Sequence, residues 1–475
     1  MKQRILIRVD VSSEIGYGHL TRCSALINSL DDVILTFYST YDINESLVDL
    51  CKLPFEFQKI THSEDFFNFV LENDIVIIDG YHFDTDYLAE LKRKIAKVIF
   101  IDDLAEFYVH ADAVINPTPG FDFTNYKGLL STQYFLGLDY ALLRKSFQLM
   151  ASETSFTKIK GSIFICFGGS DPLNKTSLAV KAVLDSKKFD EIHVVLGKGY
   201  LHNIGFNSTS ENFHIHSDLN EFEMATLMRK MEFGIVPTSG ILLECLAAKM
   251  KILSGYYIEN QQYVYREHLK LNTFIDAKNL SFESISVGLE TLLKSENKAT
   301  LIDGYSSQRV LNLIQSIQNE ANYSLRKVTD ADSEITYDWA NNAATRKYSF
   351  SQDFIPFDNH LKWFIEKVKA SNCYYYILIK NTFTFGSIRF DINNKIATIS
   401  FLVSPDHYGE GIGKILLKKG LEEFEKVVLF EQIQCVQGYV LKENIASIKL
   451  FERFGFTAEN ESNMYLFKKN TPIHV

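Results

Sequence analysis

The sequence has few cysteines and no long apolar run. Six cysteines are spread over 475 residues, and no two of them form a Cys-x-x-Cys motif. This spacing excludes a dense disulfide framework and predicts a reduced, cytoplasmic protein. No apolar run approaches the roughly 20 residues that a membrane helix needs. We therefore expect no membrane partner, and the first residues do not resemble a signal peptide.

An excess of basic charge is also missing. The chain has 49 Lys and Arg against 59 Asp and Glu, which gives a formal net charge of −10. This balance argues against nucleic-acid binding, although local amides and arginines can still bind an anionic ligand. Hydrophobic residues make up 46% and charged residues 23% of the chain. Both values are ordinary for a globular protein, and the length predicts roughly three domains.

Short apolar runs alternate with amphipathic segments over the first two thirds of the chain. Runs rich in Val and Ile, such as 74–79 and 97–102, are separated by helical patterns and indicate parallel βαβ units. After a polar linker near 150–160 the alternation starts again. We therefore predict an α/β fold with two tandem doubly wound, Rossmann-like domains, 1–150 and 151–320, and a ligand cleft between them. A late helical segment, 304–318, is expected to close this two-domain unit.

The pattern changes from residue 324 onwards. Two helical patterns are followed by three strand-like runs between residues 373 and 403, and then by a glycine-rich loop and a helix. This order is not a third βαβ repeat. It predicts a separate α+β domain over 324–475.

A glycine turn after the first apolar run carries the first candidate site. Gly16 and Gly18 let the backbone approach a ligand, and a helix that starts at His19 offers free amides to an anion. The helix dipole disfavours a charged imidazole, so we expect His19 to be neutral and able to take a proton from water. A capping or packing role for His19 is the alternative interpretation of this motif.

The second half contains similar turns. Gly168 and Gly169 follow an apolar strand, and Ser239 and Gly240 open a helix that carries Glu244. Amides and hydroxyls at a helix start can hold phosphate, and a glutamate in the helix can accept hydrogen bonds from ribose hydroxyls. The arrangement therefore suits a nucleoside diphosphate. Alternatively, Ser239 is only an N-cap and Glu244 lies on a solvated face.

Polar residues end several of the expected strands. Asp79, Asp102 and Asn116 each stand at the end of one. Ligands bind beyond such ends in open parallel sheets, but aspartates there can equally be helix caps. His214 and His216 share one face of another strand without an apparent third ligand, and we identify no Asp-x-Asp-type site that argues for a metal. We therefore expect no metal.

Taken in order, these pieces resemble the UDP-sugar hydrolases of pseudaminic acid biosynthesis over roughly residues 4–310. The matching segments are Arg8 to Asp10, Ile15 to His19 with Arg22 and Cys23, Asp79 to Tyr81, Ile101 to Asp103, Asn116-Pro117, Gly137 to Tyr140 with Leu143-Arg144, Phe167 to Pro172, Ser239 to Glu244, and Glu259 to Gln261. The resemblance implies a fold like that of the GT-B glycosyltransferases, with UDP held mainly by the second half. It also implies that His19 acts on the nucleophilic water, and that Tyr81, Asn260 and Gln261 contact the substrate.

A second resemblance starts from the segment Tyr408 to Lys414, Tyr-Gly-Glu-Gly-Ile-Gly-Lys, which follows a strand and opens a helix. Successive amides in such a loop can cradle a pyrophosphate. Together with the helix from Asn444 that ends at a glycine, the loop resembles that of the GNAT acetyltransferases. The segment 339–364 is similar to the subgroup that acetylates amino sugars and protein N-termini. The resemblance implies acetyl-CoA as the acetyl donor, bound by Val403, Gly409, Gly411, Ile412, Gly413, Lys414 and Asn444.

Two positions depart from the GNAT pattern. The loop begins with Tyr408 where Arg or Gln is usual, and Phe451 stands where a tyrosine commonly protonates the leaving thiolate. Phe451 cannot donate a proton, so we expect Tyr439 or water to do so. Glu443 is a candidate base, with a solvated glutamate as the alternative.

The two resemblances together imply a bifunctional enzyme whose ligands are small molecules, a UDP-amino sugar and acetyl-CoA. The C-terminal domain would acetylate the 4-amino group of a UDP-linked 4-amino-4,6-dideoxy-N-acetyl hexose of the altrose type. The N-terminal pair would then release UDP and 2,4-diacetamido-2,4,6-trideoxy-L-altrose. Two alternatives stay open. One is a GT-B glycosyltransferase, and the other is a nucleotide-sugar-binding module fused to a protein N-terminal acetyltransferase.

Overall fold

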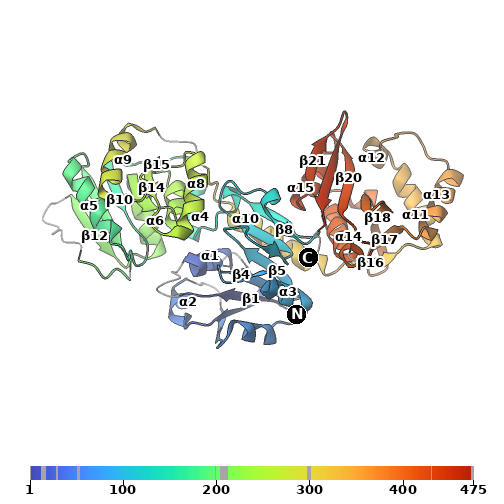
Figure 1. Ribbon diagram of the computed structural model, residues 1–475, viewed down its shortest axis with the longest axis horizontal. Coiled ribbons are helices and arrows are strands. Elements are labelled where there is room, and N and C mark those ends of the chain that lie inside the picture. The colour runs from blue at the N-terminus through green and yellow to red at the C-terminus, as the bar shows by residue number, and fades with distance from the viewer. Residues whose placement is uncertain are drawn as a thin grey trace.

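The chain forms three regions, each built around one sheet (Figure 1). The computed structural model describes residues 2–11, 18–27, 30, 32–50, 54–197, 199–203, 212–296, 301–428 and 430–471. Two parallel sheets are followed by a mixed one, which confirms the predicted fold class of tandem α/β units and a C-terminal α+β unit. In the described part of the chain, no helix is both long and apolar enough to cross a membrane.

The first region is a parallel sheet in the order β3-β2-β1-β4-β5-β7-β9. Its strands are β1 (Gln3–Val9), β2 (Val33–Ser39), β3 (Glu56–Lys59), β4 (Ile75–Asp79), β5 (Lys97–Ile101), β7 (Ala113–Asn116) and β9 (Gln133–Leu136). Its helices are α1 (Gly18–Ile27), α2 (Asn44–Leu50) and α3 (Thr85–Arg93), and a parallel pair, β6 (Tyr108–Val109) with β8 (Lys127–Gly128), stands apart.

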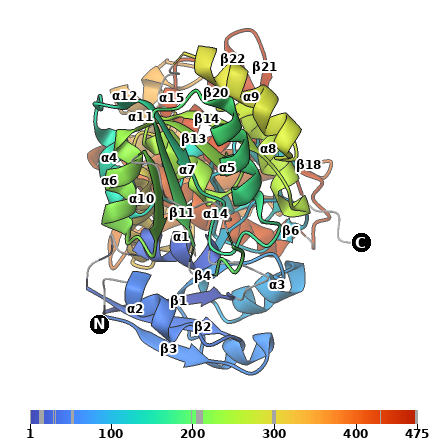
Figure 2. The same ribbon diagram turned by 90° about the vertical axis from the view of Figure 1, so that its left-hand side faces the viewer.

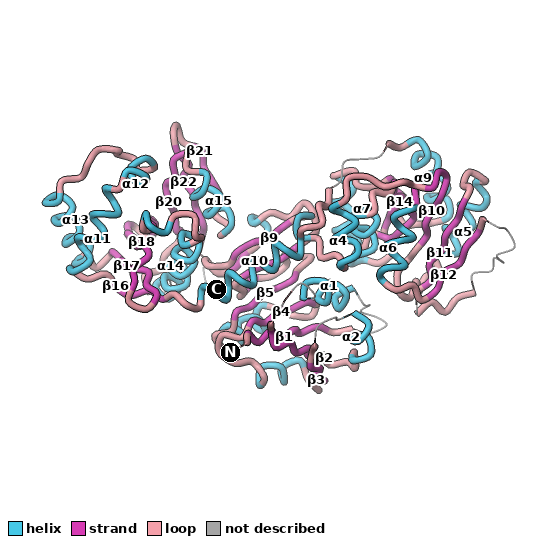
Figure 3. Tube along the Cα trace, turned by 180° about the vertical axis from the view of Figure 1, so that it is seen from behind, coloured by secondary structure: helices cyan, strands magenta, loops and turns pink. Residues whose placement is uncertain are grey.

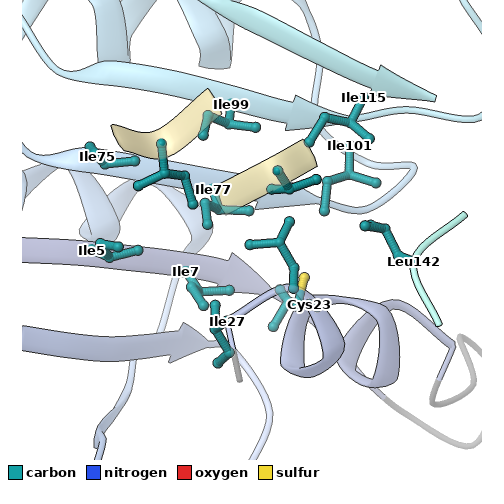
Figure 4. Close-up of a cluster of buried hydrophobic side chains, with 14 of the residues drawn as sticks. Ile5, Ile7, Cys23, Ile27, Ile75, Ile77, Ile99, Ile101, Ile115 and Leu142 are labelled. Atoms are coloured by element: carbon teal, nitrogen blue, oxygen red, sulfur yellow. The ribbon is translucent and has the colours of Figure 1, made fainter. Parts of the chain in front are cut away.

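The central strands of this sheet are apolar on both faces, as a sheet covered on two sides requires. Ile5 and Ile7 pack with Ile77 of β4 and with Cys23 and Ile27 of α1 (Figure 4). Neighbouring side chains such as those at positions 6 and 76 point to the other face, towards α3. This packing fixes α1, and therefore His19, beyond the carboxyl end of β1.

The second region is again a parallel sheet, in the order β12-β11-β10-β13-β14-β15. Its strands are β10 (Ile159–Ile165), β11 (Glu191–Leu196), β12 (Phe213–Ser217), β13 (Met231–Pro237), β14 (Lys251–Gly255) and β15 (Ile275–Asp276). The helices are α4 (Lys145–Ser152), α5 (Lys175–Ser186), α6 (Glu221–Lys230), α7 (Gly240–Ala247), α8 (Gln262–Lys270) and α9 (Phe282–Lys294). Helix α1 lies on the side of the first region that faces this one (Figures 1 and 3).

Helix α10 (Ser306–Glu320) lies within the range 151–320 that the sequence assigns to the second domain. Its apolar stripe, Val310, Leu313, Ile314 and Ile317, packs into the core of the first region. The helix therefore returns to the first region before the chain enters the third, and it lies between them in both views (Figures 1 and 3). Helical spacing predicts an apolar stripe, but it does not say which sheet the stripe will cover.

The third region is a mixed sheet in the order β16-β17-β18-β19-β20-β22-β21, in which only β19 and β20 pair in parallel. Its strands are β16 (Ser324–Lys327), β17 (Cys373–Lys380), β18 (Phe383–Asn393), β19 (Ile396–Val403), β20 (Cys435–Leu441), β21 (Thr457–Asn460) and β22 (Met464–Asn470). The helices are α11 (Ser333–Asn341), α12 (Ala343–Lys347), α13 (Phe357–Lys369), α14 (Ile412–Val428) and α15 (Ile445–Arg453). In the view turned by 90°, this region lies behind the second (Figure 2).

Candidate active sites

His19 is held at the start of α1 by a carboxylate at the end of β4. Its Nδ1 lies 2.7 Å from Oδ1 of Asp79, and the side chain is nearly buried, with 6% exposure of the residue. Asp79 is fully buried, and Arg22 donates to both of its oxygens, at 2.6 and 2.5 Å. The sequence left open whether Asp79 caps a helix, and its hydrogen bonds go instead to His19 and Arg22.

The Asp79 carboxylate determines which tautomer of His19 is favoured. An ionised carboxylate only accepts hydrogen bonds, so the imidazole proton must lie on Nδ1. Arg22 also approaches this nitrogen, at 3.1 Å, but its guanidinium donates at shorter range to Asp79. The other nitrogen, Nε2, then carries the lone pair that can accept a proton from a ligand or a water.

The charge of Asp79 is secured by its cationic neighbour. Burial alone would raise the pKa of this carboxyl, but the Arg22 guanidinium and His19 hold it well below its ordinary value. Asp79 is therefore ionised at neutral pH. It can stabilise the positive charge that forms on His19 when Nε2 takes a proton.

Arg22 extends the network to the next strand end. Its Nη1 donates to both oxygens of Asp103, at 2.8 and 2.9 Å, and the hydroxyl of Tyr81 donates to Asp103 at 3.1 Å. The Tyr81 ring stands edge-on to the imidazole of His19, with 4.8 Å between ring centroids. Burial and Asp103 raise the pKa of Tyr81, so this phenol stays protonated and can donate.

A pocket of about 180 Å³ opens beside this network, beyond the ends of β4 and β5. It is lined by Arg22, Gly80, Tyr81, His82, Phe83, Asp84, Phe100, Ile101, Asp102, Asp103, Leu104, Glu106 and Phe107. Its polar side chains include an arginine, a phenol and several carboxylates, and its apolar ones include three phenylalanines. Such a mixture of apolar surface and a few polar groups is typical of small-molecule sites. Asp102, in contrast, acts as a capping residue, because its carboxylate accepts hydrogen bonds from the backbone amides of residues 104 and 105.

Asp10, at the end of β1, forms a second buried network that the sequence did not reveal. Arg8 is fully buried and donates to both Asp10 oxygens, at 2.7 and 2.8 Å, and Ser39 and Thr40 donate to Asp10 as well. His82, which lines the pocket, lies 3.0 Å from the same carboxylate. Burial would raise the pKa of Asp10, but His82 and Arg8 lower it strongly. The network fixes the carboxyl end of β1.

In the second region, the turn after β10 keeps an open surface. Gly168 has φ +84°, a conformation that favours glycine, and no heavy atom lies within 4 Å of a Cβ placed on Gly168 or Gly169. The backbone here can therefore approach a ligand. Gly197 at the end of β11 packs against this turn so closely that a Cβ would lie 2.4 Å from the Gly169 carbonyl oxygen, a support that sequence reasoning missed.

Helix α7 begins beside this turn and carries Glu244. Ser239 is the N-cap, yet its side chain makes no cap hydrogen bond, and a Cβ on Gly240 would meet open space. The hydroxyl and the first amides of the helix are thus available to an anion. Glu244 is not on a solvated face, because the residue is only 8% exposed and binds the Arg144 guanidinium with both oxygens, at 2.8 and 2.9 Å.

Arg144 offsets the cost of burying Glu244. Burial raises the pKa of Glu244, and the nearby guanidinium of Arg144 opposes that shift. Because Arg144 directly precedes α4, the pair ties the chain that enters the second region to the candidate phosphate-binding helix. A carboxylate with two oxygens and about four lone pairs can still accept from ribose hydroxyls.

Four of the predicted substrate contacts are less informative in the structure. Gly16 lies outside the described residues, and so does the side chain of Asn260. Gly18 is the first residue of α1. Gln261, in the short turn after β14, is buried and accepts from the Tyr257 amide at 3.2 Å.

His214 and His216 gain a neighbour that the sequence did not indicate. His193 on β11 stacks on both rings, and its Nδ1 lies 3.0 Å from Nε2 of His216. Glu191 lies 3.3 Å from the other nitrogen of His193. Even so, the described residues contain no group of three or more side chains that could hold a metal ion.

In the third region, the glycine-rich loop is open where a ligand would lie. Gly409 and Gly411 have φ of +85° and +77°, and a Cβ on either would meet nothing within 4 Å. The loop leads into α14, whose first amides lie next to it. Val403, at the end of β19, lies beneath this point, since its Cγ2 is 3.6 Å from a Cβ placed on Gly413.

Strands β19 and β20 separate beside this loop. Their paired residues run only from Ile396 to Thr398 on β19, although the strand continues to Val403. Phe451 of α15 is buried next to the separation, and a Cβ on Gly438 would lie 2.6 Å from its ring. Phe451 therefore packs as an apolar residue and cannot be the general acid.

The remaining predicted residues of this region take different places. Tyr439 on β20 is 40% exposed and lies 6.4 Å, ring to ring, from Phe350. Asn444 caps α15 by accepting from the Ser447 amide at 3.1 Å, and Glu443 is exposed. Lys414 does not point along the loop, because its Nζ donates to the Ser316 hydroxyl on α10 at 2.8 Å.

Comparison with known proteins separates the chain into two parts. Residues 323–457 match the model of the acetyltransferase (GNAT) domain family. The UDP-2,4-diacetamido-2,4,6-trideoxy-beta-L-altropyranose hydrolase of Campylobacter jejuni is 26% identical over 267 residues, which cover 54% of this chain and 93% of the hydrolase.

Two further proteins are similar to this chain. An uncharacterized protein of Methanocaldococcus jannaschii is 25% identical over 501 residues, covering 98% of this chain and all of that protein. Spermidine N-acetyltransferase from Vibrio cholerae, solved in complex with CoA and spermine, is 17% identical. It covers 32% of this chain and 96% of its own, with a TM-score of 0.29.

Proposed function

We propose that this chain, which joins a region homologous to a UDP-sugar hydrolase to a C-terminal GNAT acetyltransferase domain, catalyses two consecutive steps on one UDP-linked amino sugar. The GNAT domain acetylates the C4 amine of a UDP-4-amino-4,6-dideoxy-N-acetyl altrose. The N-terminal regions then hydrolyse the resulting UDP-2,4-diacetamido-2,4,6-trideoxy-β-L-altropyranose to UDP and the free sugar. The observation that carries the hydrolytic half is the pairing of His19 with Asp79 beside a pocket.

The hydrolytic step needs one proton acceptor. UDP is a good leaving group once its charge is stabilised, so water can attack the anomeric carbon from the opposite face and invert the configuration. His19 accepts the proton of that water at Nε2, while Asp79 holds the ring and the charge that develops on it. The bond between the anomeric carbon and the UDP oxygen breaks, and its electron pair leaves with UDP.

The diphosphate is assigned to the second region. The open Gly168-Gly169 turn and the uncapped start of α7 at Ser239-Gly240 supply amides and a hydroxyl. Glu244, held by Arg144, accepts from the ribose. Tyr81, Asn260 and Gln261 are assigned to the rest of the substrate.

The acetylation step is assigned to the gap between β19 and β20 and the loop beside it. The amides of residues 409–413 fit the pyrophosphate of acetyl-CoA, since no heavy atom lies within 4 Å of a Cβ placed on Gly409 or Gly411. The sugar amine attacks the thioester carbonyl and gives up a proton to Glu443 or to water. The carbon–sulfur bond of the thioester then breaks, and the CoA thiolate leaves and takes up a proton. Tyr439 or water donates the latter proton, because Phe451 cannot.

Mass spectrometry of the full chain with UDP-4-amino sugar candidates tests this proposal. With acetyl-CoA present, the expected products are CoA, UDP and a diacetamido hexose, with no added acceptor. Release of UDP that requires a second sugar or lipid acceptor would indicate a glycosyltransferase. No turnover of any nucleotide sugar, together with acetylation of peptide N-termini, would indicate a binding module fused to a protein acetyltransferase.

A further inference from the structure

The acetyltransferase region is built directly onto the first region. Leu130, from the loop before β9, lies in the buried core of the third sheet. Lys469 of β22 donates to the carbonyls of Leu129 and Leu130, at 3.0 and 3.1 Å, and the guanidinium of Arg453 lies 4.5 Å from the centre of the Phe135 ring. The contact is therefore a packed interface between two enzyme-like halves.

Two lysines of α14 continue this interface onto α10. Lys418 and Glu320 are fully buried and lie 2.5 Å apart, and Asp112 lies 3.4 Å from the same Nζ. One turn earlier, Lys414 donates to Ser316 at 2.8 Å. The two residues on each helix are four positions apart, so they share one face of that helix. The pairs Lys414–Ser316 and Lys418–Glu320 therefore form two consecutive contacts between α10 and α14.

These two contacts involve the first turns of α14, which directly follow the glycine-rich loop. Lys414 is one residue beyond Gly413, the last glycine of the loop. Burying a charged group costs free energy unless a partner compensates it with an ion pair or a hydrogen bond. Ser316 and Glu320 supply those partners, and Ser316 also lies 3.4 Å from the Glu320 carboxylate. The position of the loop thus depends on a helix whose apolar stripe packs in the hydrolase-like half.

We propose that Ser316 and Glu320 are positioning residues for acetyl-CoA. By holding Lys414 and Lys418, they fix the start of α14 and aim the amides of residues 409–413 at the pyrophosphate. This inference rests on the proposed acetyl-CoA site but not on the identity of the sugar. It makes the hydrolase-like half a structural part of the acetyltransferase.

The environment of Lys414 supports this role. Burial lowers the pKa of Lys414 to about 8, Glu320 opposes the shift, and Lys418 and Arg453 add to it. Lys414 is half-buried, and its Nζ donates to the Ser316 hydroxyl. Removing that hydroxyl takes away the hydrogen bond that joins the first turn of α14 to α10.

Calorimetric titration of CoA into the full-length chain tests the proposal without any sugar. Ser316→Ala is expected to weaken CoA binding by about five- to tenfold, whereas Ser316→Thr, which keeps the hydroxyl, should restore it. The matched control is Gln315→Ala, on the adjacent exposed position of α10. UDP binding, measured on the same samples, should not change.

A second measurement separates positioning from general loosening of the fold. Lys414→Met alone and together with Ser316→Ala should give equal CoA affinities, because the serine acts only through the lysine. CoA affinity of Ser316→Ala equal to wild type would overturn the proposal, as would additive losses in the double variant. A wild-type chain that binds UDP but not CoA would overturn both the proposal and the acetyl-CoA assignment.

Discussion

At the scale of single residues, the proposed hydrolytic site depends on Asp79 to orient His19. Asp79→Asn would remove the carboxylate that accepts from Nδ1 and leave Arg22 partly unpaired, so the productive tautomer would no longer be favoured. We expect kcat for UDP-sugar hydrolysis to fall roughly 10²–10⁴-fold with little change in UDP affinity. Steady-state kinetics and calorimetry measure the two quantities.

The control for this variant lies on the same strand. Asp74 directly precedes β4, is also buried, and pairs with Arg4 at the far end from His19. Asp74→Asn should lower stability without lowering kcat. Equal losses of kcat in both variants would assign the effect of Asp79 to folding.

The sequence allowed two interpretations of Glu244, a ribose contact or a position on a solvated face, and the structure buries it against Arg144. If it accepts from the ribose, Glu244→Ala should weaken UDP binding by about 1.5–3 kcal/mol, the usual range for a hydrogen bond to a charged group. Glu232→Ala, which removes a half-buried glutamate near the start of β13, is the matched control. Unchanged UDP affinity in calorimetry would restrict Glu244 to its contact with Arg144.

Residue types and their local spacing could be predicted from the sequence, but their partners could not. Glycine turns and strand-end acids are visible within a few residues. The contacts of His19 with Asp79 and of Arg144 with Glu244 join positions 60 and 100 residues apart, and no local pattern encodes such pairs. Asp79 and Asp102 stand at equivalent strand ends, yet one binds His19 and the other caps backbone.

At the scale of elements, the glycine-rich loop before α14 carries the acetyl-CoA assignment. Gly411→Asp adds a negative charge where the pyrophosphate is expected, and it should abolish acetylation while hydrolysis of pre-acetylated substrate continues. Because φ at Gly411 is +77°, any side chain adds strain. Gly411→Asn, which tolerates this conformation without charge, is the control and should keep more activity. Normal acetyl transfer by Gly411→Asp would remove the loop from the site.

Helix α14 also carries a carboxyl that should make stability depend on pH. Burial raises the pKa of Glu425 from 4.5 to about 7, although Ser131 donates to it through both its amide and its hydroxyl. A raised pKa in the folded state means that the folded chain binds more protons than the unfolded one between these values. The contribution of Glu425 to stability is therefore present below pH 4.5 and is lost as the pH rises to about 7.

Urea unfolding of Glu425→Gln at pH 5 and pH 8 checks this expectation. The glutamine cannot ionise, so the variant should gain about 2 kcal/mol relative to wild type between the two conditions. Glu423→Gln, on a more exposed position of the same helix, should show no such change. A constant difference between Glu425→Gln and wild type would mean that Glu425 ionises normally in the fold.

Most helices and strands could be predicted because their periodicity is local, but their neighbours depend on the whole chain. The apolar stripe of α10 was visible in the sequence, while its return to the first sheet was not. The short pair of β6 and β8 lacks enough residues for any pattern. From its place in the sequence of α14, Lys418 would be expected at the surface. It is buried because Glu320 of α10 and Asp112, directly before β7, pair with its ammonium group.

At the scale of the whole molecule, the first region holds the other two together. It faces the second region across α1 and packs against the third through α10 and the β9 edge (Figures 1 and 3). The uncharacterized Methanocaldococcus jannaschii protein is similar over 98% of this chain, so the similarity spans both halves. An arrangement in which one region contacts both proposed sites agrees with the proposal of two steps on one substrate.

We expect His19 to direct water to the anomeric carbon of the sugar and not to phosphorus. Hydrolysis of UDP-2,4-diacetamido-2,4,6-trideoxy-β-L-altropyranose in ¹⁸O-labelled water, followed by mass spectrometry, distinguishes the two sites of attack. The predicted result is label on the anomeric carbon, unlabelled UDP, and a loss of roughly 10²–10⁴-fold in kcat for His19→Phe. Label on the phosphate of UDP, UMP as the product, or a near-normal rate for His19→Phe would contradict it.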